Sequence, residues 1–250
     1  MPMSTRAPLN SIPTGPDKAP FVHRLFSQVA PTYDLLNRVL SAGQDRGWRR
    51  AAARRANLNP GDRALDVATG TGDLARELKS IVGAEGLVVG LDFCRPMLTL
   101  AIERNRLAHA DVPYVEGDAM NLPFGDNTFN ASTIAFGARN VIDLPRLFRE
   151  MTRVARPNGR VVCLEISRPV MPGLKQAFHL YFSRILPWIA RLFHSRRSNY
   201  AYLPASLAIF PERDEVARMM SSAGLCDVTV TNLTGGIVAV FTGRKPETEG

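Results

Sequence analysis

A glycine-rich turn at residues 70–72, Gly-Thr-Gly, is the first feature that points to chemistry. It follows a short apolar run and precedes a helical pattern that begins at Asp73. Such a turn is typical of nucleotide binding, because glycine lets the backbone approach the ligand and the helix N-terminus faces it. Triphosphates, dinucleotides and other adenosine-containing molecules all bind turns of this kind. Gly70, Thr71 and Gly72 are therefore candidate ligand-binding residues, but they do not identify the ligand.

The residue after Gly72 excludes a nucleoside triphosphate. A P-loop needs a lysine and a serine or threonine there, and Asp73 would instead repel phosphate. A dinucleotide fits better, because Ala75 can serve as the third small residue of its motif. Asp92 lies about twenty residues further on, where an acid can bind a ribose hydroxyl. S-adenosylmethionine carries the same ribose, so both ligands remain open at this point.

Three aspartates at successive strand ends favour S-adenosylmethionine. Asp66 ends the first predicted strand, where a carboxylate suits a cationic amino-acid group better than a pyrophosphate. Asp118 ends the third, within reach of an adenine amino group. Any one of them, Asp92 included, could be an ordinary polar loop residue. Together they lie on the carboxyl edge of a parallel sheet, where ligands bind. No tyrosine is followed four residues later by lysine, as in one common dehydrogenase pair.

Strand and helix patterns alternate from residue 64 onward, which predicts an α/β, doubly wound parallel sheet. The patterns predict strands at 64–68, 87–92, 112–118, 129–136 and 160–166, and helices at 73–82, 95–108 and 143–155. After a helix at 215–224, two strands at 226–232 and 237–243 are joined by only four residues. So short a link cannot hold a crossover helix, so this pair must be antiparallel. The architecture resembles the seven-stranded fold of the class I S-adenosylmethionine-dependent methyltransferases.

The chain is expected to form one domain. Its 250 residues are 45% hydrophobic, which suffices for one sizeable core. We predict a disordered, proline-rich tail at 1–20, a methyltransferase domain at 21–246 and a short tail at 247–250. Within the domain, 21–58 is expected to be a helical cap and 173–194 an inserted basic amphipathic helix.

Charge and composition limit the environment of the protein. The net charge of +8 is concentrated in residues 1–58 and 168–202, which attract anionic partners such as lipid headgroups or nucleic acid. No apolar run approaches the roughly 20 residues of a membrane span, and no secretory signal is visible. Three isolated cysteines and four scattered histidines show no metal-ligand spacing. We therefore expect a cytoplasmic protein without a metal.

Four sequence blocks resemble the ubiquinone/menaquinone biosynthesis C-methyltransferases: residues 31–50, 117–143, 198–211 and 232–246. This resemblance covers about residues 21–246. It implies methyl transfer from S-adenosylmethionine to a ring carbon of a polyprenylated quinol, and it implies that Thr71, Asp92, Asp118 and Ala119 contact the cofactor. The chain departs from the family at Ala68, where glycine is frequent, and at Ala135, where a cofactor-contacting serine is frequent.

Arg139 is the predicted catalytic residue. Because it follows the fourth strand, it belongs to the ligand edge, where its cation can stabilise the quinolate that attacks the methyl group. The alternative is a structural pair with Asp143 at helical spacing. Asn140 can bind a ring oxygen or cap the next helix. Tyr33, Tyr200 and Tyr202 are candidates for the ring pocket or for ordinary packing.

The partners follow from the substrate that the resemblance implies. A polyprenylated quinol is dissolved in the bilayer, so the basic segments predict transient contact with the inner face of the membrane. The apolar face of 173–194 would enter the lipid boundary, or else be buried or form a homo-oligomer contact. An RNA methyltransferase, a non-catalytic binding protein and an enzyme for another phenolic ring are the other hypotheses. No RNA-binding module is visible, so no nucleic-acid partner is expected. The choice between naphthoquinol and benzoquinol rings stays open.

Overall fold

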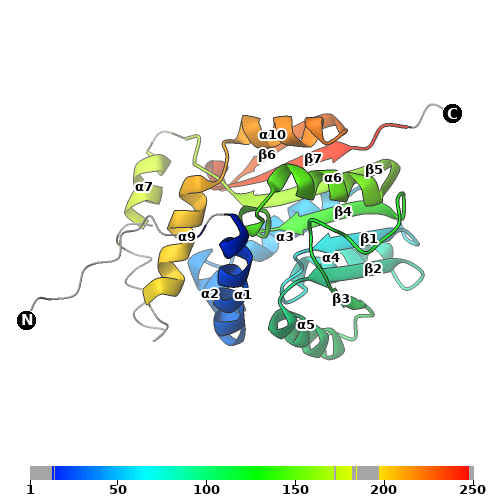
Figure 1. Ribbon diagram of the computed structural model, residues 1–250, viewed down its shortest axis with the longest axis horizontal. Coiled ribbons are helices and arrows are strands. Elements are labelled where there is room, and N and C mark those ends of the chain that lie inside the picture. The colour runs from blue at the N-terminus through cyan, green and yellow to red at the C-terminus, as the bar shows by residue number, and fades with distance from the viewer. Residues whose placement is uncertain (1–12, 14, 172, 182–183, 185–196, 248–250) are drawn as a thin grey trace, which may run out of the picture.

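Seven strands form one sheet in the order β3-β2-β1-β4-β5-β7-β6 (Figure 1). We describe it from a computed structural model that covers residues 13, 15–171, 173–181, 184 and 197–247. The strands are β1 (Arg63–Val67), β2 (Leu87–Asp92), β3 (Tyr114–Glu116), β4 (Phe129–Ala135), β5 (Ala155–Ile166), β6 (Cys226–Leu233) and β7 (Val238–Arg244).

Helices connect these strands and also precede them. The α-helices are α1 (Lys18–Val29), α2 (Tyr33–Leu40), α3 (Asp45–Arg55), α4 (Asp73–Val82), α5 (Arg95–Leu107), α6 (Leu144–Val154), α7 (Leu174–Leu180), α9 (Arg197–Ile209) and α10 (Arg213–Ser222). The short 3₁₀ helices are η1 (Gly15–Asp17), η2 (Ala30–Thr32), η3 (Ala138–Asn140) and η5 (Thr234–Gly236).

The sheet is buried on both faces, as its nearly continuous apolar strands require. Alternate residues of β1 belong to two different cores, because successive side chains of a strand point to opposite faces. Leu65 packs in the core that contains Phe148 of α6 and Met220 of α10. Ala64 packs in the core that contains side chains of α3 and α4, such as Leu78.

One reversed strand distinguishes this sheet from a fully parallel one. The pairs that β1 makes with β2 and β4, β2 with β3, and β4 with β5 are all parallel. β7 inserts between β5 and β6 and is antiparallel to both. The connection from β6 to β7 is η5, which leaves no room for a crossover helix. The prediction of an antiparallel C-terminal pair, and with it the α/β class, is therefore confirmed.

Four helices gather at one end of the sheet: α1, α2, α7 and α9 (Figure 1). α1 begins earlier than predicted, so the proposed tail of 1–20 is wrong for residues 15–20, which lie in η1 and the first turn of α1. Pro20 fits there because the first turn of a helix has no intrahelical N–H partners to lose. Lys18 anchors this start, since its Nζ donates to the carbonyls of Arg139 (3.1 Å) and Val141 (2.7 Å).

The remaining predictions on domain organisation are met only in part by the described residues. Of the predicted helix 173–194, the structure has α7, whereas residues 182–183 and 185–194 lie outside the described residues. β5 begins at Ala155, five residues before the predicted start at residue 160, and its register to β4 shifts between Phe129 and Ala131. Within the described residues, no helix combines the length and apolar character needed to cross a membrane.

Candidate active site

A cavity lies at the carboxyl ends of β1, β2 and β4, beside the loop that follows β3. Asp92 ends β2 and lines this cavity, as do Gly70 from the loop after β1 and Phe136 from the loop after β4. Phe26 of α1 and Tyr33 of α2 close it from the opposite side. The cavity therefore occupies the edge where a parallel sheet binds its ligand. We call it the cofactor cavity.

The glycine turn is held to the end of β2 by Asp92. The backbone N–H of Gly70 donates to Oδ2 of Asp92 (2.8 Å), and that of Cys94 donates to Oδ1 (2.9 Å). Burial raises the pKa of Asp92, although these hydrogen bonds oppose the shift. Gly72 has φ +80°, and a Cβ on it would lie 2.3 Å from the hydroxyl of Tyr114. The positive φ favours glycine at 72, and a larger residue there would also displace the side chain of Tyr114.

Asp118 and Ala119 also line the cofactor cavity. β3 ends at Glu116, so Asp118 belongs to the following loop rather than to the strand end. Its Oδ1 accepts a hydrogen bond from the backbone N–H of Met120 (2.9 Å), which fixes the carboxylate against its own loop. The sequence-predicted set of Gly70, Asp92, Asp118 and Ala119 is therefore brought together around one cavity.

Asp66, Thr71 and Gly72 lie behind the cavity wall and are not among its lining residues. Asp66 is buried, and it accepts hydrogen bonds from the hydroxyls of Thr69 (2.7 Å) and Thr133 (3.0 Å). Burial raises its pKa to about 6. Thr71 is also buried, and its hydroxyl donates to Asp34 of α2 (2.9 Å). In this structure Asp66 and Thr71 therefore support the turn, and their direct contact with a cofactor stays a prediction.

Arg139 occupies η3, just beyond β4, and its side chain is buried. Its Nη1 donates to Oε1 of Glu165 (2.5 Å) and to the carbonyl of Phe136 (2.8 Å). Burial opposes its charge, but the Glu165 carboxylate outweighs that effect and the pKa of Arg139 is raised. The expected alternative partner, Asp143, instead caps α6 by accepting from the backbone N–H of Arg146 (2.8 Å).

Arg139 does not line the cofactor cavity; it lines a second one, of about 400 Å³, which we call the acceptor cavity. Its walls come from α2, α3, α7, η5 and the start of β7. Most of the lining residues are apolar, such as Phe178 and Ile237. Phe136 lines both cavities and separates them. Besides Arg139, the charged residues on the wall are Asp45 and Arg49 of α3.

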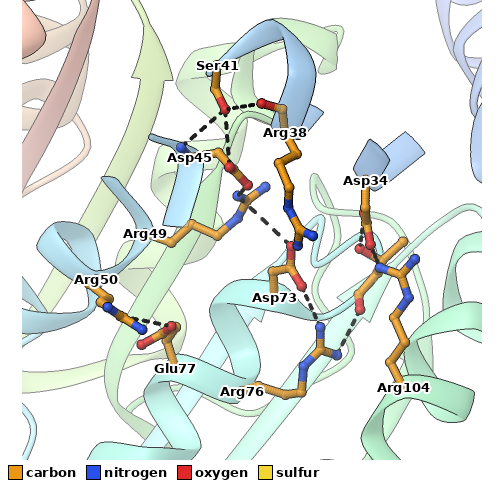
Figure 2. A network of polar contacts seen from close by, with 11 residues as sticks. Asp34, Arg38, Ser41, Asp45, Arg49, Arg50, Asp73, Arg76, Glu77 and Arg104 are labelled. Carbon is orange, nitrogen blue, oxygen red and sulfur yellow. Dashed lines mark hydrogen bonds and ion pairs between the residues drawn. The ribbon is translucent and has the colours of Figure 1, made fainter. Parts of the chain in front are cut away.

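A chain of polar contacts runs from the acceptor cavity to the glycine turn (Figure 2). Arg49 pairs with Asp45 (2.7 Å) and lies 4.0 Å from the carboxylate of Asp73, the residue that follows the turn. Asp73 in turn pairs with Arg76 (2.5 Å). Asp45 and Arg49 were not identified from the sequence as site residues. Their spacing of four, which allows pairing on one helix face, was the available signal.

Of the other predicted pocket residues, some line the cofactor cavity and one positions a lining residue. Tyr33 and Asn140 line the cofactor cavity. The hydroxyl of Tyr202 donates to Oδ1 of Asn140 (2.8 Å), so Tyr202 positions Asn140 from a buried site. The side chain of Tyr200 lies outside the described residues. In the described part of the chain, no cluster of three or more histidine, cysteine, aspartate or glutamate residues is arranged to hold a metal.

The comparison with solved structures concerns the fold. A SAM-dependent methyltransferase from Aquifex aeolicus superposes with a TM-score of 0.57 over 78% of this chain and 88% of its own, at 19% identity. With the strand order and the reversed β7, this likeness confirms the class I methyltransferase fold.

The sequence comparisons show a closer similarity than the comparison with solved structures. The demethylmenaquinone methyltransferase of Desulfitobacterium hafniense (strain Y51) is 40% identical over 239 residues, which is 93% of each chain. That of Shouchella clausii (strain KSM-K16) is 42% identical over 228 residues, covering 90% of this chain and 96% of the relative. The model of the ubiE/COQ5 methyltransferase family matches residues 15–245. The resemblance stated from the sequence is confirmed, and the chain belongs to the ubiE/COQ5 methyltransferase family.

Proposed function

We propose that this protein transfers a methyl group from S-adenosylmethionine to a ring carbon of a polyprenylated quinol, converting demethylmenaquinol to menaquinol. The observation that carries the proposal is the pair of cavities on either side of Phe136. One offers carboxylates and a glycine turn for a nucleoside, and the other offers an apolar space with a few buried charges for a hydrophobic ring. The relatives named demethylmenaquinone methyltransferase support the choice of ring.

The residues of the cofactor cavity fit S-adenosylmethionine. Both oxygens of Asp92 accept one backbone hydrogen bond, and each carboxylate oxygen has a second lone pair free for a ribose hydroxyl. Asp118 supplies a further acceptor for the adenine amino group. Phe93 and Met97 provide apolar walls for the adenine faces. When bound, S-adenosylmethionine would supply an electrophilic methyl group to a ring carbon, and the ring proton and S-adenosylhomocysteine would be released as products.

Arg139 is proposed to stabilise the ring oxyanion that develops during this reaction. It lines the acceptor cavity, and its cation is maintained by Glu165 at 2.5 Å. Among the described residues its Nε–H has no hydrogen-bond partner, although it is buried. A buried, unpaired donor on a charged group is available to a ring oxygen, and such preorganised donors are effective where water is excluded.

We further propose that the protein is cytoplasmic and touches the inner membrane surface transiently to collect its substrate. The helices around the acceptor cavity carry exposed apolar side chains, including Leu35 and Val39 of α2 and Leu180 of α7. α2 and α7 gather at the same end of the sheet (Figure 1). Binding to vesicles with anionic headgroups, compared with binding to RNA at equal salt, tests this contact.

The test of the function is genetic and chemical. A strain that lacks this protein and any paralogue is expected to accumulate a quinone lighter by one CH₂, about 14 Da. Purified protein with S-adenosylmethionine is expected to restore the missing methyl in an extract of that strain. Quinone of normal mass in the deletion strain would overturn the proposal. The Asp92→Asn variant serves as a control, because it alters the cofactor cavity and leaves the acceptor cavity intact.

A further inference from the structure

Asp45 is the only carboxylate among the described residues that line the acceptor cavity. It is 6% exposed, although it lies in the most basic stretch of the chain. A buried carboxylate in an apolar cavity is costly unless it is paired and hydrogen-bonded. Asp45 meets this condition by pairing with Arg49, and it also lines the cavity to which the acceptor ring is assigned.

The position of Asp45 is fixed from two sides (Figure 2). Oδ2 accepts from Nη1 of Arg49 (2.7 Å), and Oδ1 accepts from the hydroxyl of Ser41 (3.1 Å). The guanidinium of Arg49 lies 5.3 Å from the ring centroid of Phe136, the wall that the two cavities share. Each carboxylate oxygen thus accepts one hydrogen bond and keeps a second lone pair for a further donor.

An ionised carboxylate accepts hydrogen bonds and donates none. It therefore attracts a ring hydroxyl and repels a ring carbonyl, whose oxygen also only accepts. We infer that Asp45, held in place by Arg49, selects the reduced, hydroquinone form of the acceptor ring over the oxidised quinone. This inference rests on the proposed function, because it assigns the ring of that substrate to the acceptor cavity. It makes Asp45 a specificity-determining residue rather than the group that activates the ring.

Discrimination against the quinone suits the reaction, because only the hydroquinone ring can develop the oxyanion that drives electron density to carbon. An oxidised ring in the same cavity would occupy the site unproductively. A quinone would place an acceptor oxygen against the carboxylate of Asp45, and such a repulsive contact rejects the wrong ligand.

The test is a binding measurement. The ligands are 2,3-dimethyl-1,4-naphthoquinone and its hydroquinone, titrated without oxygen into the full-length protein and followed by calorimetry. Methyl groups on both ring carbons prevent addition of the partly exposed Cys226 thiol and make turnover impossible. Wild-type protein is expected to bind the hydroquinone roughly 10- to 100-fold more tightly, which corresponds to one hydrogen bond to a charged group. The Asp45→Asn variant, whose amide can donate to a carbonyl, is expected to bring the ratio within about threefold.

Two further variants make the result decisive. Asp111→Asn changes an exposed carboxylate outside the cavity and is expected to keep the wild-type ratio. Asp45→Glu keeps a carboxylate and is expected to retain a preference for the hydroquinone, which a merely structural role would not require. An unchanged ratio in Asp45→Asn, with methyl transfer intact in wild type, overturns the inference alone. Failure of wild-type protein to bind either ring overturns the proposed function as well.

Discussion

Replacing Glu165 by glutamine removes the buried counter-charge of Arg139 with little change in shape. Glu165 is fully buried, and its carboxylate accepts from Nη1 of Arg139 (2.5 Å), from the backbone N–H of Arg139 (3.2 Å) and from that of Ile166 (2.8 Å). The glutamine of Glu165→Gln keeps one carbonyl oxygen, but its amide N–H groups would face a donor of Arg139. The variant therefore loses the charge and one of the accepted hydrogen bonds.

The expected loss is about 3 kcal/mol in the free energy of unfolding, the lower end of the range for breaking a buried ion pair by removing one partner. Solvent does not reduce this figure much, because the exposed fractions of the two side chains are 8% and 0%. For a chain of 250 residues this corresponds to a fall in Tm of roughly 6–12 °C. The matched control is Glu77→Gln, which breaks the more exposed pair with Arg50 and is expected to cost no more than about 1 kcal/mol.

Urea denaturation followed by circular dichroism measures both variants. Equal midpoints for Glu165→Gln and Glu77→Gln would refute the reasoning, because they would mean that Arg139 does not need its buried partner. The double variant Arg139→Met with Glu165→Gln adds a second check. It removes the uncompensated charge, so it is expected to be more stable than Glu165→Gln alone.

Three further changes test the glycine turn. Burial raises the pKa of Asp66 from 3.8 to about 6, so its contribution to stability is present below about pH 4 and is lost as the pH rises through 6. The asparagine of the Asp66→Asn variant does not titrate. The free energy of unfolding of this variant, measured by urea denaturation, should therefore rise relative to that of wild type by roughly 3 kcal/mol between about pH 4 and pH 7. A difference between variant and wild type that does not change with pH would contradict this. Thr71→Val removes the hydrogen bond to Asp34 (2.9 Å) and should lower the free energy of unfolding by about 1 kcal/mol, with Thr99→Val, an exposed threonine elsewhere, as control. Asp92→Asn places an amide against the backbone N–H of Gly70 and should weaken S-adenosylmethionine binding about tenfold or more in calorimetric titration, and unchanged affinity would remove Asp92 from the cofactor site.

Much of the fold was predictable because its signals are local. The buried strands read as short apolar runs, and the helices between them are longer and show one apolar face, so length and periodicity together separate them. The reversal of β7 followed from the short link before Ile237. Gly70 was found from the glycine-rich turn, and Asp92 and Asp118 were found because parallel strands all end at the same edge.

The partners of buried charges could not be predicted in this way. For Arg139 the alternative to a catalytic role was a pair with Asp143 at helical spacing, whereas its partner is Glu165, 26 residues away on β5. Arg49 lies in a stretch that reads as a basic surface, yet only the fold decides which of its arginines turns inward. The carboxylate of Asp66 accepts a hydrogen bond from the hydroxyl of Thr133, 67 residues further along, and no local pattern indicates this partner. Contacts between distant segments decide these cases, and periodicity carries no signal of them.

The two cavities are completed at different stages of translation. All residues that line the cofactor cavity lie between Ala19 and Ile142. The acceptor cavity also needs Thr234, Ile237 and Val238, and Thr234 is hydrogen-bonded to Trp48 and Gln44, 186 and 190 residues earlier in the chain. The chain is synthesised from the N-terminus to the C-terminus. The nascent polypeptide therefore contains every lining residue of the cofactor cavity well before the last wall of the acceptor cavity has been synthesised. A premature stop codon shortly before residue 234 would therefore yield a chain that still contains every lining residue of the cofactor cavity but lacks one wall of the acceptor cavity.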